Sequence, residues 1–205
     1  MNQPARGVAY LPSATHNMGV NQQTSGDADH VTNVVFAGIG GQGVITASDI
    51  LADAAFRAGF DVKKAEIHGM SQRGGSVTSD VRFGRKVLSP MVPEGEADFL
   101  VVLSPDQIDN TRHLLRPGGV LLEPALIDVS RLGSNRAFNT AMLGVLSRLL
   151  TLSEDVWTSA IRAHLPEKVD EVNLEAFRYG RELAKHGLPA QRKGGSGAAA
   201  ATGAE

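Results

Sequence analysis

Two glycine-rich segments of this sequence contain the residue types that bind anions. The first covers residues 38–43, reads GIGGQG and has the G-x-G-x-x-G spacing. A strand is predicted before it and a helix after it, so its glycines would allow a tight turn, and the helix N-terminus would offer unpaired N–H groups to an anion. The candidate ligand-binding residues in this segment are Gly38, Gly40, Gly41, Gln42 and Gly43.

The spacing alone leaves three interpretations open. One is a dinucleotide site, in which Glu66, at the end of the second predicted strand, would bind a ribose. Another is a site for a different phosphate or diphosphate. The third is structural, because the glycines would also suit the close packing of a strand against a helix.

The second segment covers residues 66–76 and reads EIHGMSQRGGS. It follows the second predicted strand, which places it at the carboxyl end of the sheet, on the same edge as residues 38–43. Its glycines would expose backbone N–H groups, and Arg73 could make a two-pronged contact with phosphate or carboxylate. An ordinary solvated loop is the alternative. The candidate ligand-binding residues here are His68, Ser71, Gln72, Arg73 and Gly74.

Catalytic chemistry by the second segment itself is disfavoured. Glu66 and His68 would form a dyad only if the strand continued through both, because only then do side chains at i and i+2 point the same way. A metal site is also disfavoured, since two candidate ligands do not make one. We therefore expect neither a catalytic residue nor a metal ligand on this chain.

The elements that position these segments follow from hydrophobic periodicity. Strands are predicted at residues 31–37, 61–67, 99–103 and 120–122, and helices at 44–58, 105–115, 139–150, 154–164 and 170–186. The first two strands and their intervening helix predict a parallel pair, and residues 76–90 predict a hairpin that turns at Gly84-Arg85. The expected fold class is α/β, a Rossmann-like, mostly parallel sheet with flanking helices, an inserted β-hairpin and a helical C-terminal segment.

Composition limits the function classes. The chain has 205 residues and no cysteine, which excludes disulfides, thiolate nucleophiles and cysteine-bound iron–sulfur clusters on this chain. A net charge of -2 and few aromatic residues give no reason to expect nucleic acid or an anionic membrane as a partner. Without a recognisable signal peptide or membrane span, a cytoplasmic location is expected. Residues 1–30 and 188–205 are predicted to be flexible tails of one domain at residues 31–187.

Three stretches of the sequence closely resemble the gamma-domain family of 2-oxoacid:acceptor oxidoreductases, and most of all its indolepyruvate branch. They read GIGGQGV at residues 38–44, AEIHGMSQRGGSV at 65–77 and SDVRFG at 79–84. The resemblance runs through residues 32–186, and the segments at 139–144 and 173–180 look like the helical C-terminal part of that family. It implies the small subunit of an enzyme that oxidatively decarboxylates a 2-oxoacid and forms an acyl-coenzyme A.

The resemblance also implies how the cofactors are divided between subunits. Thiamine diphosphate, its Mg²⁺ and the iron–sulfur clusters would be held by a large partner subunit, which would pass electrons to ferredoxin, and coenzyme A would be the co-substrate. The absence of cysteine agrees with this division. The candidate residues of both segments would then contact a phosphate of coenzyme A or of thiamine diphosphate across the interface.

Two other functions remain as alternatives. One is a self-sufficient NAD(P)-dependent dehydrogenase that uses residues 38–43, although no substrate domain and no proton-transfer pair are apparent further along the chain. The other is an interaction module without catalytic function that has kept the fold.

Overall fold

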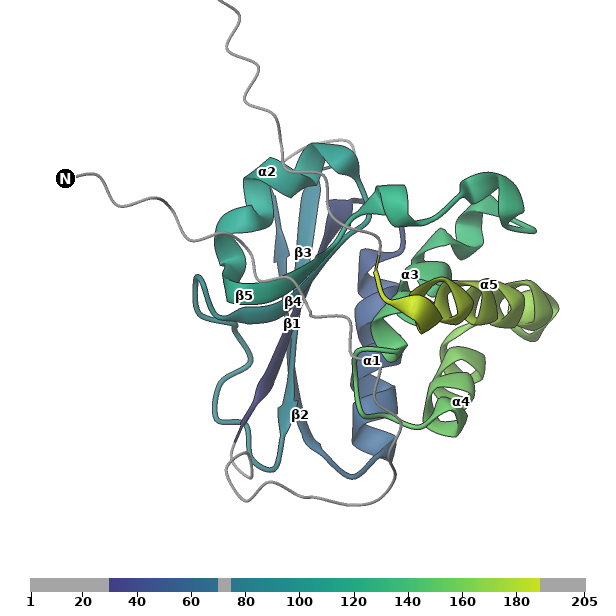
Figure 1. The fold of residues 1–205 in the computed structure, drawn as a ribbon. Helices are drawn as coiled ribbons and strands as arrows, with labels where there is room; N and C mark the ends of the chain where they lie inside the picture. Colours follow the sequence, from purple (N-terminus) through teal and green to yellow (C-terminus); the bar gives the residue numbers. More distant parts are fainter. Residues whose placement is uncertain (1–29, 70–74, 189–205) are drawn as a thin grey trace, which may run out of the picture.

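The computed structural model describes residues 30–69 and 75–188, which fold into one five-stranded sheet with helices on both faces (Figure 1). The strands are ordered β2-β3-β1-β4-β5 across the sheet. Their bounds are β1 (Thr32–Ile39), β2 (Asp61–His68), β3 (Ser76–Gly84), β4 (Ala97–Val102) and β5 (Leu115–Leu122). The predicted tails lie outside the described residues, apart from His30 and Leu188.

The strand directions confirm the predicted α/β fold. β1 pairs with β4 and β4 with β5 in parallel, whereas β3 is antiparallel to both of its neighbours, β1 and β2. Of the strands that the structure describes, β1, β2, β4 and β5 therefore share one direction, and β3 runs opposite to them. The predicted direct pairing of the first two strands is wrong, because β3 lies between β1 and β2.

The hairpin predicted at residues 76–90 is also wrong in its second arm. Residues 76–84 form β3, and their hairpin partner is β2. Residues 85–96 form a loop instead of a strand, and polar side chains of β2 and β3 bind part of its backbone. Asp61 accepts a hydrogen bond from the Val87 amide at 2.8 Å, and Arg82 donates to the carbonyl oxygens of Ser89 and Met91 at 3.1 and 3.0 Å.

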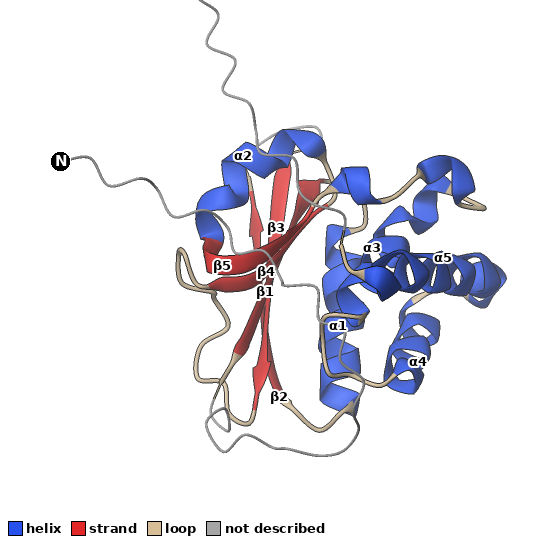
Figure 2. Cartoon of the chain, viewed as in Figure 1, coloured by secondary structure: helices blue, strands red, loops and turns tan. Residues whose placement is uncertain are grey.

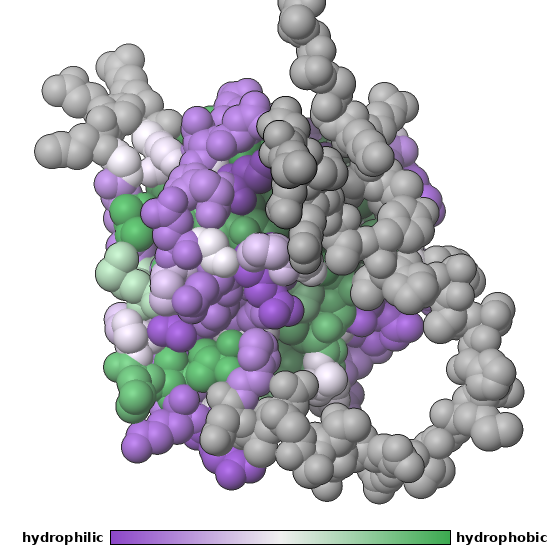
Figure 3. All heavy atoms as spheres, turned by 60° about the vertical axis from the view of Figure 1, so that its left-hand side comes forward, coloured by the Kyte–Doolittle hydropathy of each residue, from purple (hydrophilic) through white to green (hydrophobic). Residues whose placement is uncertain are grey.

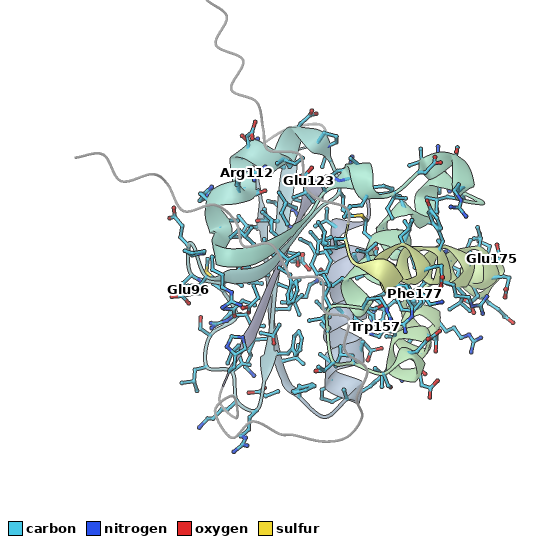
Figure 4. The ribbon with its side chains drawn as sticks, viewed as in Figure 1. Glu96, Arg112, Glu123, Trp157, Glu175 and Phe177 are labelled. Atoms are coloured by element: carbon cyan, nitrogen blue, oxygen red, sulfur yellow. The ribbon has the colours of Figure 1, made fainter. Side chains whose placement is uncertain are left out.

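The longer helices of the described residues all lie on one side of the sheet (Figure 2). They are α1 (Val44–Arg57), α3 (Phe138–Ser147), α4 (Glu154–His164) and α5 (Asp170–Leu183), close to the predicted bounds. Their apolar stripes and the facing strand residues form the larger core. Trp157 of α4 and Phe177 of α5 meet in this core, with ring centroids 5.9 Å apart (Figure 4).

The other face of the sheet is covered by shorter helical segments. The helix predicted at residues 105–115 is broken into a 3₁₀ turn at Pro105–Gln107, the short α2 (Ile108–Thr111) and a second 3₁₀ turn at Arg112–Leu114. A second apolar cluster beneath it includes Val35, Leu100 and Leu121, together with Val92 from the loop. No helix within the described residues is long and apolar enough to cross a membrane.

Candidate functional site

The two glycine-rich segments meet at one edge of the sheet, as predicted. Ile39 at the end of β1 lies opposite Ser76 at the start of β3. Just beyond this pair, the Gly40 amide donates a hydrogen bond to the Gly75 carbonyl oxygen at 3.1 Å, and the Gly69 amide donates to the Ser76 carbonyl oxygen at 2.7 Å. The antiparallel insertion of β3 is what carries the second segment to the β1–α1 turn.

The glycines of the first segment have different roles. Gly38 is required for packing, because a Cβ there would lie 2.7 Å from Cγ2 of Val44. Gly41 and Gly43 have positive φ angles of 89° and 80°, which favour glycine. A Cβ on Gly41 would meet no described atom within 4 Å, so this part of the turn is open, whereas one on Gly43 would collide with the side chain of Asn139.

Gln42 closes the turn through its own side chain. Its Oε1 accepts a hydrogen bond from the Ile39 amide at 2.8 Å, while its backbone amide donates to the Ile39 carbonyl oxygen at 3.1 Å. The side-chain oxygen is therefore committed to the shape of the loop, and only the Nε2 donors remain for a ligand. The prediction of Gln42 as a simple ligand contact missed this structural role.

Asn139 of α3 packs against the glycine turn and hydrogen-bonds to it. It was not among the predicted site residues. Its Nδ2 donates to the Gly43 carbonyl oxygen at 3.2 Å, and its Oδ1 accepts from the Thr140 amide at 2.9 Å. The Thr140 hydroxyl is 2.8 Å from Oδ1 of Asn173, whose Nδ2 donates to the Val169 carbonyl oxygen. These side chains are buried. They form a polar chain that connects the glycine turn to α5.

His68 and Glu66 are neighbours on the edge strand. Because β2 continues through both residues, their side chains lie on the same face, with His68 Nε2 and Glu66 Oε2 3.5 Å apart. The stronger partner of Glu66 is Lys64, whose Nζ lies 2.6 Å from Oε1. The hydrogen bond from Lys64 holds the pKa of Glu66 below its ordinary value. His68 is exposed, so its imidazole is accessible to a ligand.

The position of Glu66 disfavours the dinucleotide interpretation. In a dinucleotide site, the ribose-binding acid lies at the end of the strand that neighbours β1. Here β3 lies between β1 and β2, so β2 is two strand spacings, or roughly 10 Å, away from β1. The carboxylate is also engaged by Lys64. The glycine turn therefore lacks its expected ribose partner.

The remaining candidate residues of the second segment, Ser71, Gln72, Arg73 and Gly74, lie outside the described residues. Within the described residues, no group of three or more histidine, aspartate or glutamate side chains is arranged to hold a metal ion. The described part of the glycine turn instead presents hydrogen-bond donors. The Gly41 amide has no hydrogen-bond partner among the described residues, and the amides in the first turn of α1 are left unpaired by helix geometry. Such a turn suits an anion.

Comparisons with known proteins give a consistent picture. The family model described as pyruvate ferredoxin/flavodoxin oxidoreductase matches residues 33–125 and 124–183. The chain is 35% identical to the indolepyruvate oxidoreductase subunit IorB of Thermococcus kodakarensis, with 76% of this chain and 97% of that protein covered. It is 32% identical to the ketoisovalerate oxidoreductase subunit VorA of Methanothermobacter marburgensis, over 76% of this chain but 37% of that longer protein.

A solved structure shares the fold. The gamma subunit of a keto/oxoacid ferredoxin oxidoreductase from Geobacter sulfurreducens superimposes with a TM-score of 0.64 and 27% identity, covering 75% of this chain and 98% of that subunit. The mixed sheet described above is therefore also the architecture of that subunit.

Proposed function

The chain belongs to the pyruvate ferredoxin/flavodoxin oxidoreductase family, and we propose from this premise that it is the small subunit, without clusters, of a thiamine-diphosphate-dependent 2-oxoacid:ferredoxin oxidoreductase. The proposed substrate is indolepyruvate or another arylpyruvate. The identity of 35% over nearly the whole length of an indolepyruvate oxidoreductase subunit supports this choice. The chain would be inactive alone.

The observation that carries the proposal is the junction of the two glycine segments. The Gly40–Gly75 hydrogen bond fixes an open turn at Gly41 beside the unpaired amides of α1, and exposed His68 lies on the strand that leads into the second segment. Backbone donors in this arrangement can hold a diphosphate without any metal of their own. The ligand would be coenzyme A or the thiamine diphosphate of the large subunit.

The residues present fit such a ligand as an orienting surface. When bound in the complex, thiamine diphosphate supplies the carbon nucleophile and the electron sink for decarboxylation. The amide of Gly41 and the first turn of α1 would hold phosphate oxygens. Because the chain has no cysteine, the electrons would leave through clusters on the partner subunit to ferredoxin.

The test is reconstitution. The chain is co-expressed with the thiamine-diphosphate-binding subunit encoded by the same genome, and the purified complex is assayed for reduction of ferredoxin with indolepyruvate, phenylpyruvate or pyruvate and coenzyme A. We expect arylpyruvates to have the highest kcat/KM, and neither subunit alone to be active. Activity of the isolated chain with NAD or NADP, or failure of the two subunits to associate, would contradict the proposal.

A further inference from the structure

The end of β1 lies between two connections that leave the sheet on opposite faces. After β1 the chain continues into α1 on one face, and after the neighbouring parallel strand β4 it continues into residues 105–114 on the other. Figure 3 brings the second of these faces forward and shows hydrophobic areas interrupted by hydrophilic ones. In open α/β sheets, ligands bind at the carboxyl ends of strands whose connections part in this way. A ligand on the glycine turn would therefore also lie near the residues that follow β4.

Gln107 is the side chain that reaches the glycine segments from the residues after β4. Its Oε1 accepts a hydrogen bond from the Ser76 hydroxyl at 2.6 Å. Ser76 is the first residue of β3 and lies opposite Ile39, the last residue of β1. Ser76 points away from α1, because the next residue, Val77, belongs to the larger core on the α1 side. Gln107 therefore meets the sheet edge that carries the glycine turn, and it does so from the face opposite α1.

The side chain of Gln107 is packed, yet its donors are free. The residue is 7% exposed. Its Nε2 donates to no atom of the described residues. In the same part of the chain, the fully buried side-chain atoms without a hydrogen-bond partner belong to Trp157 and Asp170, so the Nε2 of Gln107 is reached by solvent. A packed side chain whose accessible atom is a hydrogen-bond donor is arranged to meet an acceptor.

Gln42 has the same arrangement on the α1 face. Its Oε1 accepts a hydrogen bond from the Ile39 amide at 2.8 Å, and a Cβ on Gly38 would lie 2.9 Å from this oxygen. Each glutamine oxygen therefore already accepts a hydrogen bond at the end of β1 or from the residue paired with it. Both side chains are left with their nitrogen atoms as donors. Phosphate oxygens, which accept hydrogen bonds without donating any, suit two such donors.

We infer that Gln107 is a second side-chain contact of the anionic ligand that the glycine turn holds, an inference that rests on the proposed function. The ligand chemistry is that of a phosphate or diphosphate, which receives the Nε2 of Gln42 from one face of the sheet and the Nε2 of Gln107 from the other. The Ser76 hydroxyl positions Gln107 by occupying its oxygen. Coenzyme A and thiamine diphosphate are the two sources of this chemistry, and the experiment distinguishes them.

Two variants of similar shape separate ligand contact from a role in packing. Gln107→Glu keeps an oxygen that can accept from Ser76 but replaces the Nε2 donor with a second carboxylate oxygen, whereas Gln107→Met removes both functions. A ligand contact predicts that Gln107→Glu weakens binding more, because it brings a negative charge to a phosphate. A packing role predicts the opposite order, because only Gln107→Met breaks the hydrogen bond to Ser76.

The measurement is titration calorimetry of the complex between the full-length chain and the thiamine-diphosphate-binding subunit. Coenzyme A is titrated into the complex, and thiamine diphosphate with Mg²⁺ is titrated into the complex freed of cofactor. We expect Gln107→Glu to raise the Kd of one of these ligands by at least about 30-fold and Gln107→Met by about tenfold. The ligand whose Kd rises is the one that the turn holds. Asn110→Asp is the matched control, because it makes the same amide-to-carboxylate change at an exposed residue of α2, and its Kd values should change by less than about twofold.

The order of the two Gln107 variants decides the inference. Wild-type Kd values for both ligands in Gln107→Glu would overturn it, and so would a larger loss of binding in Gln107→Met than in Gln107→Glu. Thermal unfolding shows whether each variant is folded. If Gln107→Glu does not fold, the uncharged Gln107→Met decides alone, and its unchanged Kd values would overturn the inference. The proposed function is tested separately, because it would be contradicted by failure of the wild-type complex to form or to reduce ferredoxin.

Discussion

At the scale of single residues, Asn139 is the side chain on which the glycine turn depends. It is buried, and its amide donates to the Gly43 carbonyl oxygen while its oxygen accepts from the Thr140 amide. Asn139→Ala would leave both backbone groups without these partners, so we expect the free energy of unfolding to fall by about 1–3 kcal/mol. Urea denaturation measures this change. Asn110→Ala, which removes an exposed amide of α2, should cost less than about 0.5 kcal/mol.

Asp80 gives a prediction about pH. Burial raises the pKa of its carboxyl group above the ordinary 3.8, although the Val92 amide and Arg82 oppose the shift. Because the folded state then binds the proton more tightly than the unfolded state, the charged carboxylate destabilises the fold, and stability falls as pH rises from 3.8 through the raised pKa. Asp80→Asn lacks this titration.

The measurement for Asp80 compares denaturation of both proteins between about pH 3.5 and 7. Relative to the wild type, Asp80→Asn should become progressively more stable as pH rises, and the difference should level off above the raised pKa. A difference that stays constant with pH would show that the burial of this carboxylate has no energetic effect on folding.

At the scale of elements, two glycines, Gly144 of α3 and Gly180 of α5, allow the backbones of these helices to come into close contact where they cross. A Cβ on Gly144 would collide with the Phe177 carbonyl oxygen and lie 3.0 Å from Cα of Gly180, and one on Gly180 would collide with the Ala141 carbonyl oxygen. Gly144→Ala should therefore lower the free energy of unfolding by about 1–3 kcal/mol, even though alanine favours an isolated helix by about 1 kcal/mol. Thermal and urea unfolding measure this, and a stabilised variant would show that the helices can separate without cost.

The elements also show which features of the fold are encoded locally. The pattern of residues 31–58 predicts β1 and α1 nearly to their observed ends, because a short run of apolar, β-branched residues and a helical periodicity are both local properties. The position of β3 between β1 and β2 depends on which strands pair with each other. The hydrophobic pattern along the sequence carries no information about strand pairing. Likewise, Asn139 lies 96 residues from Gly43, so only the folded chain shows that it supports the predicted site.

At the scale of the whole molecule, the two faces and two edges of the sheet are unequal. Among the residues that the structure describes, four helices lie on one side of the sheet, whereas the edge strand β2 pairs with β3 alone, and its last three residues, Glu66–His68, are exposed. Regions with few buried contacts open most readily. In the isolated chain, we expect β2 amides that bond to β3 to exchange at least about tenfold faster than those of β1, which corresponds to about 1.4 kcal/mol of opening free energy.

Native-state hydrogen exchange of the isolated chain tests this difference, with β4 as the second central strand for comparison. Equal protection of β1, β2 and β4 would mean that the sheet opens only as a unit and that the edge carrying His68 is already rigid. A weakly protected β2 would mean that the rim of the candidate site is ordered largely by assembly. In the proposed complex, the chain would then complete its ligand surface only when the partner subunit is bound, and binding would be accompanied by an ordering cost.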